Sequence, residues 1–463
     1  MRTGRREAGV AVRPPYLATA AVLLGFVAVS HFVPAAFSGF PSKVPPLFAQ
    51  WDPLASPLLA VPLALVAGAW AARRRIARMR TPAFLAAAVG GTWALASTLA
   101  VESGRARAFH GCCARGGWRT MLVGQLANPS DYYADVPTVD RLGLRAFDAR
   151  YPELARAGLR ALSVHATTHP AGAVVLLWVL SLLVGRHLLG VALLVVLIGA
   201  LGAIPTYAIA REVYGEEAAR AATILFAASP AVLLYSATSV DAAFMTAIAV
   251  AAAALVRAPR SDGWAVGAGA LAYVALALTW GAFALGPIGI GVAWLALRDG
   301  RVGARDLARR TALALAGFAA AGIVVWAAIG LNLVADFGPS LAHQVGYATY
   351  RRPFDYWVVG NVAAFAIGAG IAVTALVVAE AMGRWRERRP GFETVVLAAI
   401  VLASLTTMFK GETDHNWLFF VPPYLAVAGA AAARRRGRDG AFVPAAGAFG
   451  QAALEQVLLY TSW

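Results

Sequence analysis

Apolar segments of about 20 residues recur along almost the whole of this 463-residue chain. Apolar residues make up 60% of the sequence and charged residues only 14%, whereas a soluble domain has about 25% charged residues. A helix that crosses a membrane needs about 20 consecutive apolar residues. A single soluble core cannot cover this much apolar surface, so we predict an all-α polytopic membrane protein.

Arginines gather in short segments between the apolar stretches, as the positive-inside rule describes. These clusters lie at 2–13, 73–80, 257–260, 298–310, 384–389 and 434–438. With the N-terminus in the cytoplasm, the pattern predicts about twelve spans. We place them at 17–37, 55–72, 83–101, 189–210, 217–236, 240–257, 263–281, 283–298, 310–331, 357–380, 393–409 and 416–433. Topology thus accounts for the net charge of +16, and we expect no nucleic-acid partner.

The short apolar segment 171–185 decides the orientation of every later span. If it crossed the membrane, the later arginine clusters would all lie outside, so we predict a re-entrant or interfacial helix. We expect one transmembrane domain over 1–440, which includes an extracytoplasmic loop with short interfacial helices over 102–185. The remaining segment, 441–463, is expected to be a cytoplasmic or interfacial tail.

Three polar segments lie on the predicted outer face, at 102–170, 332–356 and 410–417. They concentrate carboxylates, histidines and tyrosines, whereas arginines dominate the inner face. This asymmetry favours a site that opens to the outside.

Two carboxylates in the first outer segment are candidates for acid–base chemistry. Asp131 and Asp135 are four residues apart, so they share one face of a helical turn. Such a pair can deprotonate a hydroxyl group or hold a cation. The alternative is a solvated loop with a side-chain cap beside Pro129 and Pro137.

Possible metal ligands follow in the same segment. His165 and His169 have the spacing that lets two imidazoles bind one metal from a helix, but Pro170 disfavours a helix at His169. The sequence has no HExxH pattern, so we favour other roles over a zinc site. Cys112 and Cys113 are adjacent, and neighbouring cysteines rarely bridge each other without strain, so their state stays open.

Other patterns are missing from the sequence. It has neither a GxxxxGK[ST] loop nor a GxGxxG turn after a strand, so nucleotide-driven transport has no support. Ionisable residues are sparse within the predicted spans, with Asp241 as the main exception. Proton-coupled transporters carry such groups near the middle of the membrane, and their scarcity counts against that class.

Several motifs together resemble the membrane glycosyltransferases of the C-type fold. They are Asp-Tyr-Tyr at 131–133, THPAG at 168–172, AREVYG at 210–215, AARAATILFAASPAVLLYSAT at 218–238 and KGETDHNWLFFVPPYL at 410–425. The similar families are the protein O-mannosyltransferase-like, aminoarabinose-transferase-like and actinobacterial polyprenyl-phosphate-sugar transferases. The chain departs from them in three ways. Ala171 replaces a second proline, His415 or Asn416 stands where arginine is frequent, and more than one span precedes the acidic loop.

The resemblance implies an inverting glycosyltransferase in a bacterial plasma membrane, with its active site on the extracytoplasmic side. Its donor is a polyprenyl-phosphate monosaccharide, either a hexose or a pentose, and its acceptor is a hydroxyl group on a glycan, lipid or protein. Membrane lipids surround it. An outer-loop carboxylate is the base, and we expect Asp131 in this role, with Asp135 second. No cofactor is required, although some members of the superfamily use a divalent metal.

The resemblance also implies residues that bind the substrates. His169 would orient the base or bind phosphate, and Arg351 and Arg352 would hold the donor phosphate through bidentate contacts. The other expected substrate-binding residues, most of them aromatic groups that stack on sugar rings, are Tyr132, Tyr133, Tyr347, Glu412 and Trp417.

Two other functions stay open at this point. One is a lipid or polysaccharide transporter or flippase, and the other is a non-catalytic membrane assembly factor. Sugar transfer that is lost in Asp131→Asn would distinguish the enzyme from both.

Overall fold

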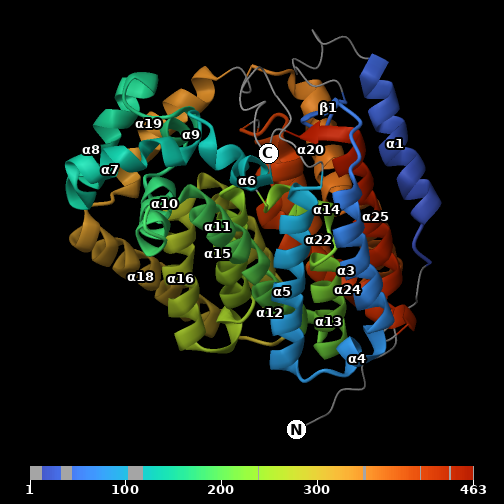
Figure 1. Cartoon of the computed structure of the whole chain (residues 1–463). Helices are drawn as coiled ribbons and strands as arrows, with labels where there is room; N and C mark the ends of the chain where they lie inside the picture. The colour runs from blue at the N-terminus through green and yellow to red at the C-terminus, as the bar shows by residue number, and fades with distance from the viewer. Residues whose placement is uncertain are drawn as a thin grey trace.

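The computed structural model describes residues 13–32, 44–102, 118–237, 239–347, 351–406, 408–436 and 440–461. Over these residues nearly all regular structure is helical (Figure 1), which confirms the predicted fold class. Only two short strands accompany the helices in the described segments. β1 (Ala49–Trp51) pairs antiparallel with β2 (Leu459–Thr461).

Six helical segments in the described part of the chain are long and apolar enough to cross a membrane. They are built from α5 (Thr81–Ala100), α11 with α12 (Leu188–Leu201 and Ala203–Tyr214), α15 with η5 (Asp241–Leu255 and Ala258–Arg260), η6 with α17 (Trp280–Ala284 and Leu285–Arg298), α18 (Ala304–Ile329), and α23 with η7 and α24 (Thr413–Asn416, Leu418–Phe420 and Val421–Arg436). A bent pair, α20 and α21 (Phe354–Ala369 and Ile371–Arg386), brings the number to seven at most. Shorter apolar helices are α1 (Tyr16–Phe32), α3 (Ala60–Ala71), α10 (Gly172–Leu183), α16 (Asp262–Leu278) and α22 (Phe392–Leu405). The count of twelve spans therefore stays a prediction.

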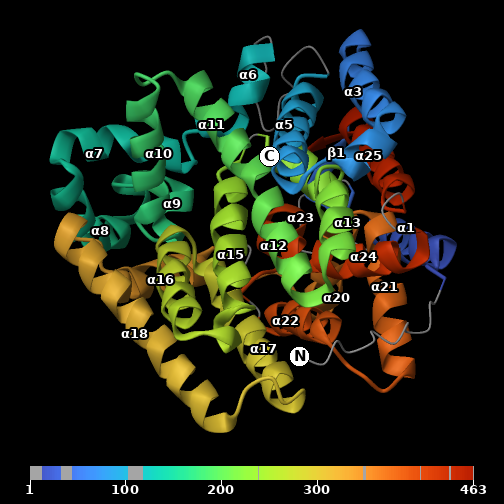
Figure 2. The same cartoon turned by 90° about the horizontal axis from the view of Figure 1, so that it is seen from below.

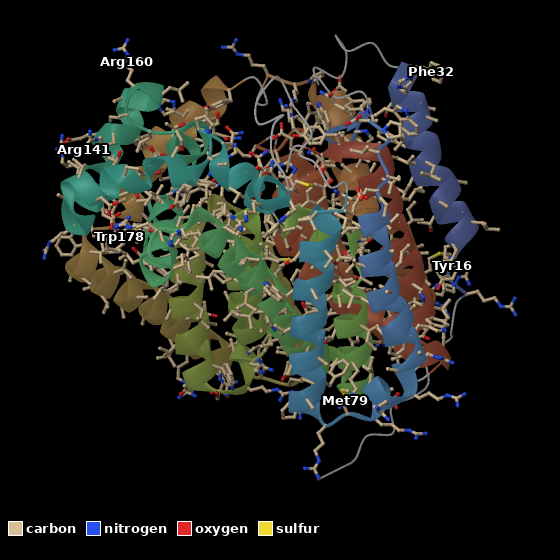
Figure 3. All side chains as sticks on the ribbon, viewed as in Figure 1. Tyr16, Phe32, Met79, Arg141, Arg160 and Trp178 are labelled. Atoms are coloured by element: carbon tan, nitrogen blue, oxygen red, sulfur yellow. The ribbon has the colours of Figure 1, made fainter. Side chains whose placement is uncertain are left out.

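Short helices from the predicted outer segments cover one end of the bundle. They are α6 (Trp118–Val123), α7 (Val136–Leu142), α8 (Leu144–Ala157), α9 (Val164–Thr168) and α19 (Leu333–Gly346). Arg160 extends away from the molecule at this end, whereas Met79, just after α4 (Arg73–Arg78), lies at the opposite end (Figure 3). The view from below shows α18 at one edge of the bundle and α1 near the opposite edge (Figure 2).

Two of the predicted spans are interrupted. The span expected at 357–380 is wrong as a single helix, because α20 and α21 meet at Gly370 with a bend of 111°. The φ of Gly370 is +113°, a conformation that suits glycine. The span expected at 217–236 is likewise divided, into α13 (Glu216–Phe226) and α14 (Pro230–Tyr235).

Side chains from other helices bind the backbone at these interruptions. Gln451 accepts a hydrogen bond from the Ile371 N–H at 2.8 Å and donates one to the Ile367 carbonyl at 2.8 Å. Ser229, at the break before α14, donates to the Ala369 carbonyl at 3.0 Å. Such internal partners are needed where helices break in a membrane, so the two interruptions support each other.

The C-terminal segment differs from the expected surface tail. Residues Phe442–Leu458 form helix α25, which packs against α13, α14 and α21. The chain then continues into β2, which pairs with β1. Gln451 lies on α25, so this helix is part of the bundle that holds the bent pair.

The buried apolar side chains form two large clusters. One contains residues of α5, α12–α15, α17, α20–α22 and α24–α25, and the other joins the outer helices to α10, α11 and α15. Neighbouring residues of α15 belong to different clusters, since Phe244 packs in the second and Met245 in the first. The N-terminal end of α15 therefore lies where the outer helices meet the rest of the bundle.

Helices α16 and α18 approach closely through glycines. A Cβ atom on Gly269 would overlap the Ala314 carbonyl oxygen, and one on Gly317 would overlap the Val266 carbonyl oxygen. Small residues allow this kind of backbone approach between membrane helices.

We expect Gly269→Ala to separate α16 from α18 and to lower the melting temperature of the purified protein by several degrees. Overpacking of this kind typically costs about 1–3 kcal/mol. Gly267→Ala is the matched control, since a Cβ on Gly267 of the same helix meets nothing within 4 Å. Equal melting temperatures for the two variants would contradict the close approach.

Candidate active site

A polar cavity of about 270 Å³ lies where the outer helices meet the bundle. Its wall combines residues from the turn before α7, from α9, from the start of α15, from the end of α19 and from the 408–416 turn. The polar residues of this wall are Asp131, Tyr132, His165, Thr168, His169, Ser239, Asp241, Gln344, Tyr347, Lys410, Glu412 and Asn416.

Asp131 enters the cavity from a turn that its neighbours define. The Asn128 side chain accepts the Ser130 N–H at 2.9 Å, and the Asn128 carbonyl accepts the Asp131 N–H at 2.9 Å. The His165 N–H then bonds the Ser130 carbonyl at 3.1 Å, which ties α9 to this turn. The local sequence thus brings the carboxylate and the imidazole to the same wall.

Asp131 is buried and pairs with His165, whose side chain is partly exposed. The Nδ1 of His165 lies 3.4 Å from the Oδ2 of Asp131, and the aspartate is only 1% exposed. Burial lowers the pKa of His165, but the hydrogen bond and charge of Asp131 outweigh it and raise the pKa above the ordinary value. The other oxygen, Oδ1, is buried without a hydrogen-bond partner among the described residues. The carboxylate therefore keeps one oxygen that its neighbours do not satisfy.

His169 is neutral. Its Nδ1 lies 3.2 Å from the His165 carbonyl oxygen and 3.1 Å from the Thr168 hydroxyl. The carbonyl can only accept, so a proton on Nδ1 satisfies that contact and leaves Nε2 as an acceptor. Burial and then the charge of His165 lower the pKa of His169 to about 3. The ring lies against Tyr132 and Phe244. His169 can therefore accept a hydrogen bond from a hydroxyl group, but it does not supply positive charge for a phosphate.

Asp135 does not line the cavity. Its two oxygens accept the Ser163 N–H at 3.2 and 3.0 Å, and the Ser163 hydroxyl caps α9 at the Ala166 N–H. Burial raises the pKa of Asp135, although its hydrogen bonds with Ser163 oppose the shift. Tyr133 also lies outside the lining. The expected second base thus supports the start of α9.

Arg352 is engaged by the 408–416 turn. Its Nη2 lies 2.8 Å from Glu412, and its Nη1 donates to the Lys410 carbonyl at 2.6 Å. The side chain is 6% exposed. Arg351 is exposed, and neither arginine belongs to the cavity wall. This geometry favours a structural role for Arg352 over the expected contact with phosphate.

Asn361 of α20 holds the same turn. It donates to the Phe409 carbonyl, accepts the Gly411 N–H at 2.9 Å and offers its own carbonyl to Thr413. These bonds hold Glu412 with a left-handed φ of 63°. The turn presents Lys410, the only lysine or arginine among the described residues of the cavity wall.

The remaining aromatic candidates separate into two groups. Tyr132 and Tyr347 line the cavity, as expected. Trp417 instead has no exposed surface and packs against Phe365 and Phe420, so it cannot stack on a sugar in this arrangement. Tyr350, Cys112 and Cys113 lie outside the described residues.

An apolar cavity of about 480 Å³ adjoins the polar one. The two share polar wall residues, namely Thr168, His169, Asp241, Gln344 and Asn416. The aromatic side chains of Trp280, Phe283 and Phe337, which contact one another, form part of its apolar wall. A ligand with a polar head and a long apolar chain fits this pair of cavities.

The sequence-based reasoning missed several of these wall residues. Lys410, Gln344 and Asn416 were placed in outer segments but given no role. Asp241 was noted only as an ionisable residue within a span, although its position as the first residue of α15 puts it beside the site.

Within the described segments, no three side chains of His, Cys, Asp or Glu gather in a way that could hold a metal ion. Metal dependence stays untested.

The family model for dolichyl-phosphate-mannose-protein mannosyltransferases matches residues 168–331. The predicted resemblance to the C-type-fold membrane glycosyltransferases is confirmed there. The matched segment begins at Thr168 in the cavity wall and includes Asp241. A comparison with curated proteins gave no match.

Solved structures of two membrane transferases are also similar. The oligosaccharyltransferase of Archaeoglobus fulgidus, crystallised with Zn and sulfate, shares 14% identity at a TM-score of 0.46. The match covers 79% of this chain and 53% of that one, so this chain spans about half the length of that relative. ArnT from Cupriavidus metallidurans, both apo and bound to undecaprenyl phosphate, shares 16% identity at a TM-score of 0.25. The matches cover 68% of this chain and 76–77% of ArnT. With TM-scores this low, neither likeness carries an argument about activity.

A second hydrogen-bond network lies behind the His169 loop. Tyr151 of α8 donates to the Ala166 carbonyl at 2.5 Å and also lies 3.1 Å from the His169 carbonyl oxygen. Asp148, one turn earlier on α8, is 1% exposed and has no hydrogen-bond partner among the described residues. Burial and then the charge of Asp336 raise the pKa of Asp148 to about 8. Burial also raises the pKa of Asp336 to about 7.

We expect Arg352→Gln to destabilise the protein and Arg351→Gln to leave its stability unchanged. Loss of Arg352 leaves the mostly buried Glu412 carboxylate without its partner, which typically costs about 3–5 kcal/mol. Thermal unfolding of the two purified variants measures the difference. If both variants melt like the wild type, Arg352 is not holding the turn.

We expect the melting temperature to fall as the pH rises from about 5 to 8. Asp148 keeps its proton in the folded protein up to about pH 8, whereas an unfolded aspartate loses it near pH 3.9. The folded state therefore binds more protons in this window, and stability falls with rising pH. Asp148→Asn should reduce this dependence, while Glu153→Gln, at an exposed position of α8, should not. Identical pH dependence in the wild type and Asp148→Asn would show that Asp148 is already charged.

Proposed function

We propose that this protein transfers a monosaccharide from a polyprenyl-phosphate donor to an acceptor hydroxyl group, with inversion at the anomeric carbon. The observation that carries the proposal is the junction of a polar cavity with an apolar one at His169, Asp241 and Asn416. The match to the mannosyltransferase family over 168–331 supports the same class of reaction.

The donor fits this junction in one orientation. Its prenyl chain lies in the apolar cavity beside Phe283 and Phe337, where burial of apolar surface favours binding by about 25 cal/mol per Å². Its phosphate lies within reach of Lys410, whose ammonium group neutralises negative charge. Its sugar then occupies the polar cavity, where Tyr347 offers an aromatic surface and His169 accepts a hydroxyl hydrogen bond.

Asp131 is the proposed base. The acceptor oxygen forms a bond to the anomeric carbon while the bond from that carbon to the phosphate oxygen breaks. The acceptor proton passes to the Asp131 carboxylate, which belongs to the cavity wall, and the phosphate leaves with the electron pair of the broken bond. His165 holds Oδ2 and thereby orients the carboxylate. A positioned base of this kind contributes about 10²–10⁴-fold to the rate.

The site is proposed to face the outside of a plasma membrane. The arginine-rich segments lie at the other ends of the helices: α17, for example, leads from Pro287 in the apolar cavity wall to Arg298. The positive-inside rule places those arginines in the cytoplasm. A lipid-linked donor suits the outer face because its sugar is presented there without a nucleotide.

We expect Asp131→Asn to reduce turnover by about a hundredfold or more while donor affinity stays near that of the wild type, because asparagine keeps the shape but cannot take the proton. Asp135→Asn is the control, since it alters a carboxylate four residues away that lies outside the cavity wall and should affect turnover much less. The measurement is consumption of synthetic polyprenyl-phosphate sugars by the purified protein, with donor binding followed separately.

Wild-type turnover in Asp131→Asn would contradict the assignment of the base. If no sugar is transferred by the wild type and lipid still crosses vesicle membranes in Asp131→Asn, the protein is a transporter and the proposal fails.

A further inference from the structure

A third cavity, of about 800 Å³, lies at the end of the bundle opposite the proposed active site. It is enclosed by the C-terminal ends of α12, α17 and α21 and by the start of α22. Five arginines line it, namely Arg298, Arg301, Arg384, Arg388 and Arg389. None of these residues has a role in the proposed transfer reaction.

Arginines outnumber acidic residues in the wall of this cavity, so its net charge is positive. The wall contains three carboxylates against the five arginines. One of them, Glu212, pairs with Arg257 and Arg260, which lie outside the wall. Another, Asp299, is shared by Arg298 and Arg301 at 2.7 and 3.2 Å. Arg384 in turn pairs with Glu380, which lies outside the wall, at 3.4 Å. Arginines still outnumber carboxylates in the wall, so the cavity favours an anion.

Arg388 and Arg389 are at the exposed rim. They follow α21 in a tight turn, where Arg388 has a left-handed φ of 52° and the Arg389 N–H bonds the Arg384 carbonyl at 2.9 Å. Both side chains are exposed. A guanidinium group can donate two parallel hydrogen bonds to the oxygens of one phosphate. Two adjacent arginines at the rim therefore suit a phosphate group.

One wall of the cavity is apolar. It is formed by Val213, Val256, Val292, Leu295 and Phe392. A soluble phosphate would gain nothing from these side chains, whereas the first carbons of a lipid chain would be covered by them. The combination of an arginine rim and an apolar wall indicates an amphipathic ligand.

Exposed tryptophans indicate that the cavity is at the level of a membrane surface. Trp294 of α17 is 46% exposed and lies under the Arg298 guanidinium at 4.9 Å. Trp385 of α21 is 52% exposed and donates to Thr394 at 3.0 Å. Tryptophan is enriched where helices leave the hydrocarbon region of a membrane.

We infer that this cavity binds the headgroup phosphate of an anionic phospholipid from the inner leaflet. Basic pockets between transmembrane helices bind anionic headgroups in this way. The inference does not depend on the proposed sugar transfer, because it uses the opposite end of the bundle.

The test is native mass spectrometry of the purified full-length protein titrated with phosphatidylglycerol or with phosphatidylcholine. We expect saturable retention of phosphatidylglycerol and at least about a tenfold weaker apparent affinity in the double variant Arg388→Gln/Arg389→Gln. Arg305→Gln, at an exposed position of α18 outside the cavity wall, is the matched control and should bind like the wild type.

Three outcomes would overturn the inference: equal retention of both lipids, an equal loss in the double variant and the control, or displacement of phosphatidylglycerol by millimolar inorganic phosphate. Quenching of tryptophan fluorescence by brominated phosphatidylglycerol gives a second readout. It should diminish in Trp385→Phe and in the double variant, and unchanged quenching in both would also contradict the site.

Discussion

Hydrogen bonds from side chains to interrupted backbone hold this structure together at the places where it departs from regular helix. A membrane interior offers no water to unpaired N–H and carbonyl groups, so each break needs a partner from the protein. Gln451 supplies it at the Gly370 bend. Buried backbone outside the spans also needs partners, and Asn361 supplies them along the 409–413 turn. Tyr151 does the same at the Ala166 carbonyl. Two of these three interruptions carry residues of the proposed site or lie directly beside them, so the chemistry depends on the same bonds that permit the breaks.

The proposed site consists of a polar cavity and an apolar cavity that adjoin each other. Asp131, His165 and Lys410 come from segments outside the spans. The aromatic side chains of the adjoining cavity come from η6, at the start of a span, and from the outer helix α19. A lipid-linked sugar has the same division between a charged head and an apolar chain. This correspondence explains why the polar wall residues gather at the start of α15, where the two apolar clusters of the core meet.

The fold class and much of the site could be predicted from the sequence. Composition and arginine spacing predict a helical membrane protein. The outer segments concentrate carboxylates, histidines and tyrosines, so a polar cavity was expected among them. Asp131, Tyr132, His169, Tyr347 and Glu412 were all expected and all line the cavity. The resemblance to the membrane glycosyltransferases selected these residues, and their positions in polar segments between apolar stretches placed them at the outer end of the bundle.

The failures share a physical cause, because sequence shows that a group is charged but not which partner it meets. Arg352 and Arg351 are adjacent and chemically identical, yet one is buried against Glu412 and the other is exposed. Asp135 accepts a hydrogen bond from the Ser163 N–H, and Trp417 packs against Phe365. Both partners lie in segments that are distant in the sequence. The bend at Gly370 has the same origin, since Gln451, which bonds the backbone on both sides of it, lies 80 residues beyond Ile371 in the chain.

The proposed function requires that the polar and apolar cavities together bind one polyprenyl phosphate. A cryo-electron microscopy structure of the protein with added polyprenyl phosphate tests it most directly. We expect the phosphate within hydrogen-bonding distance of Lys410 and the prenyl chain beside Phe283 and Phe337. A lipid whose phosphate lies outside the polar cavity, with both cavities unchanged, would contradict it.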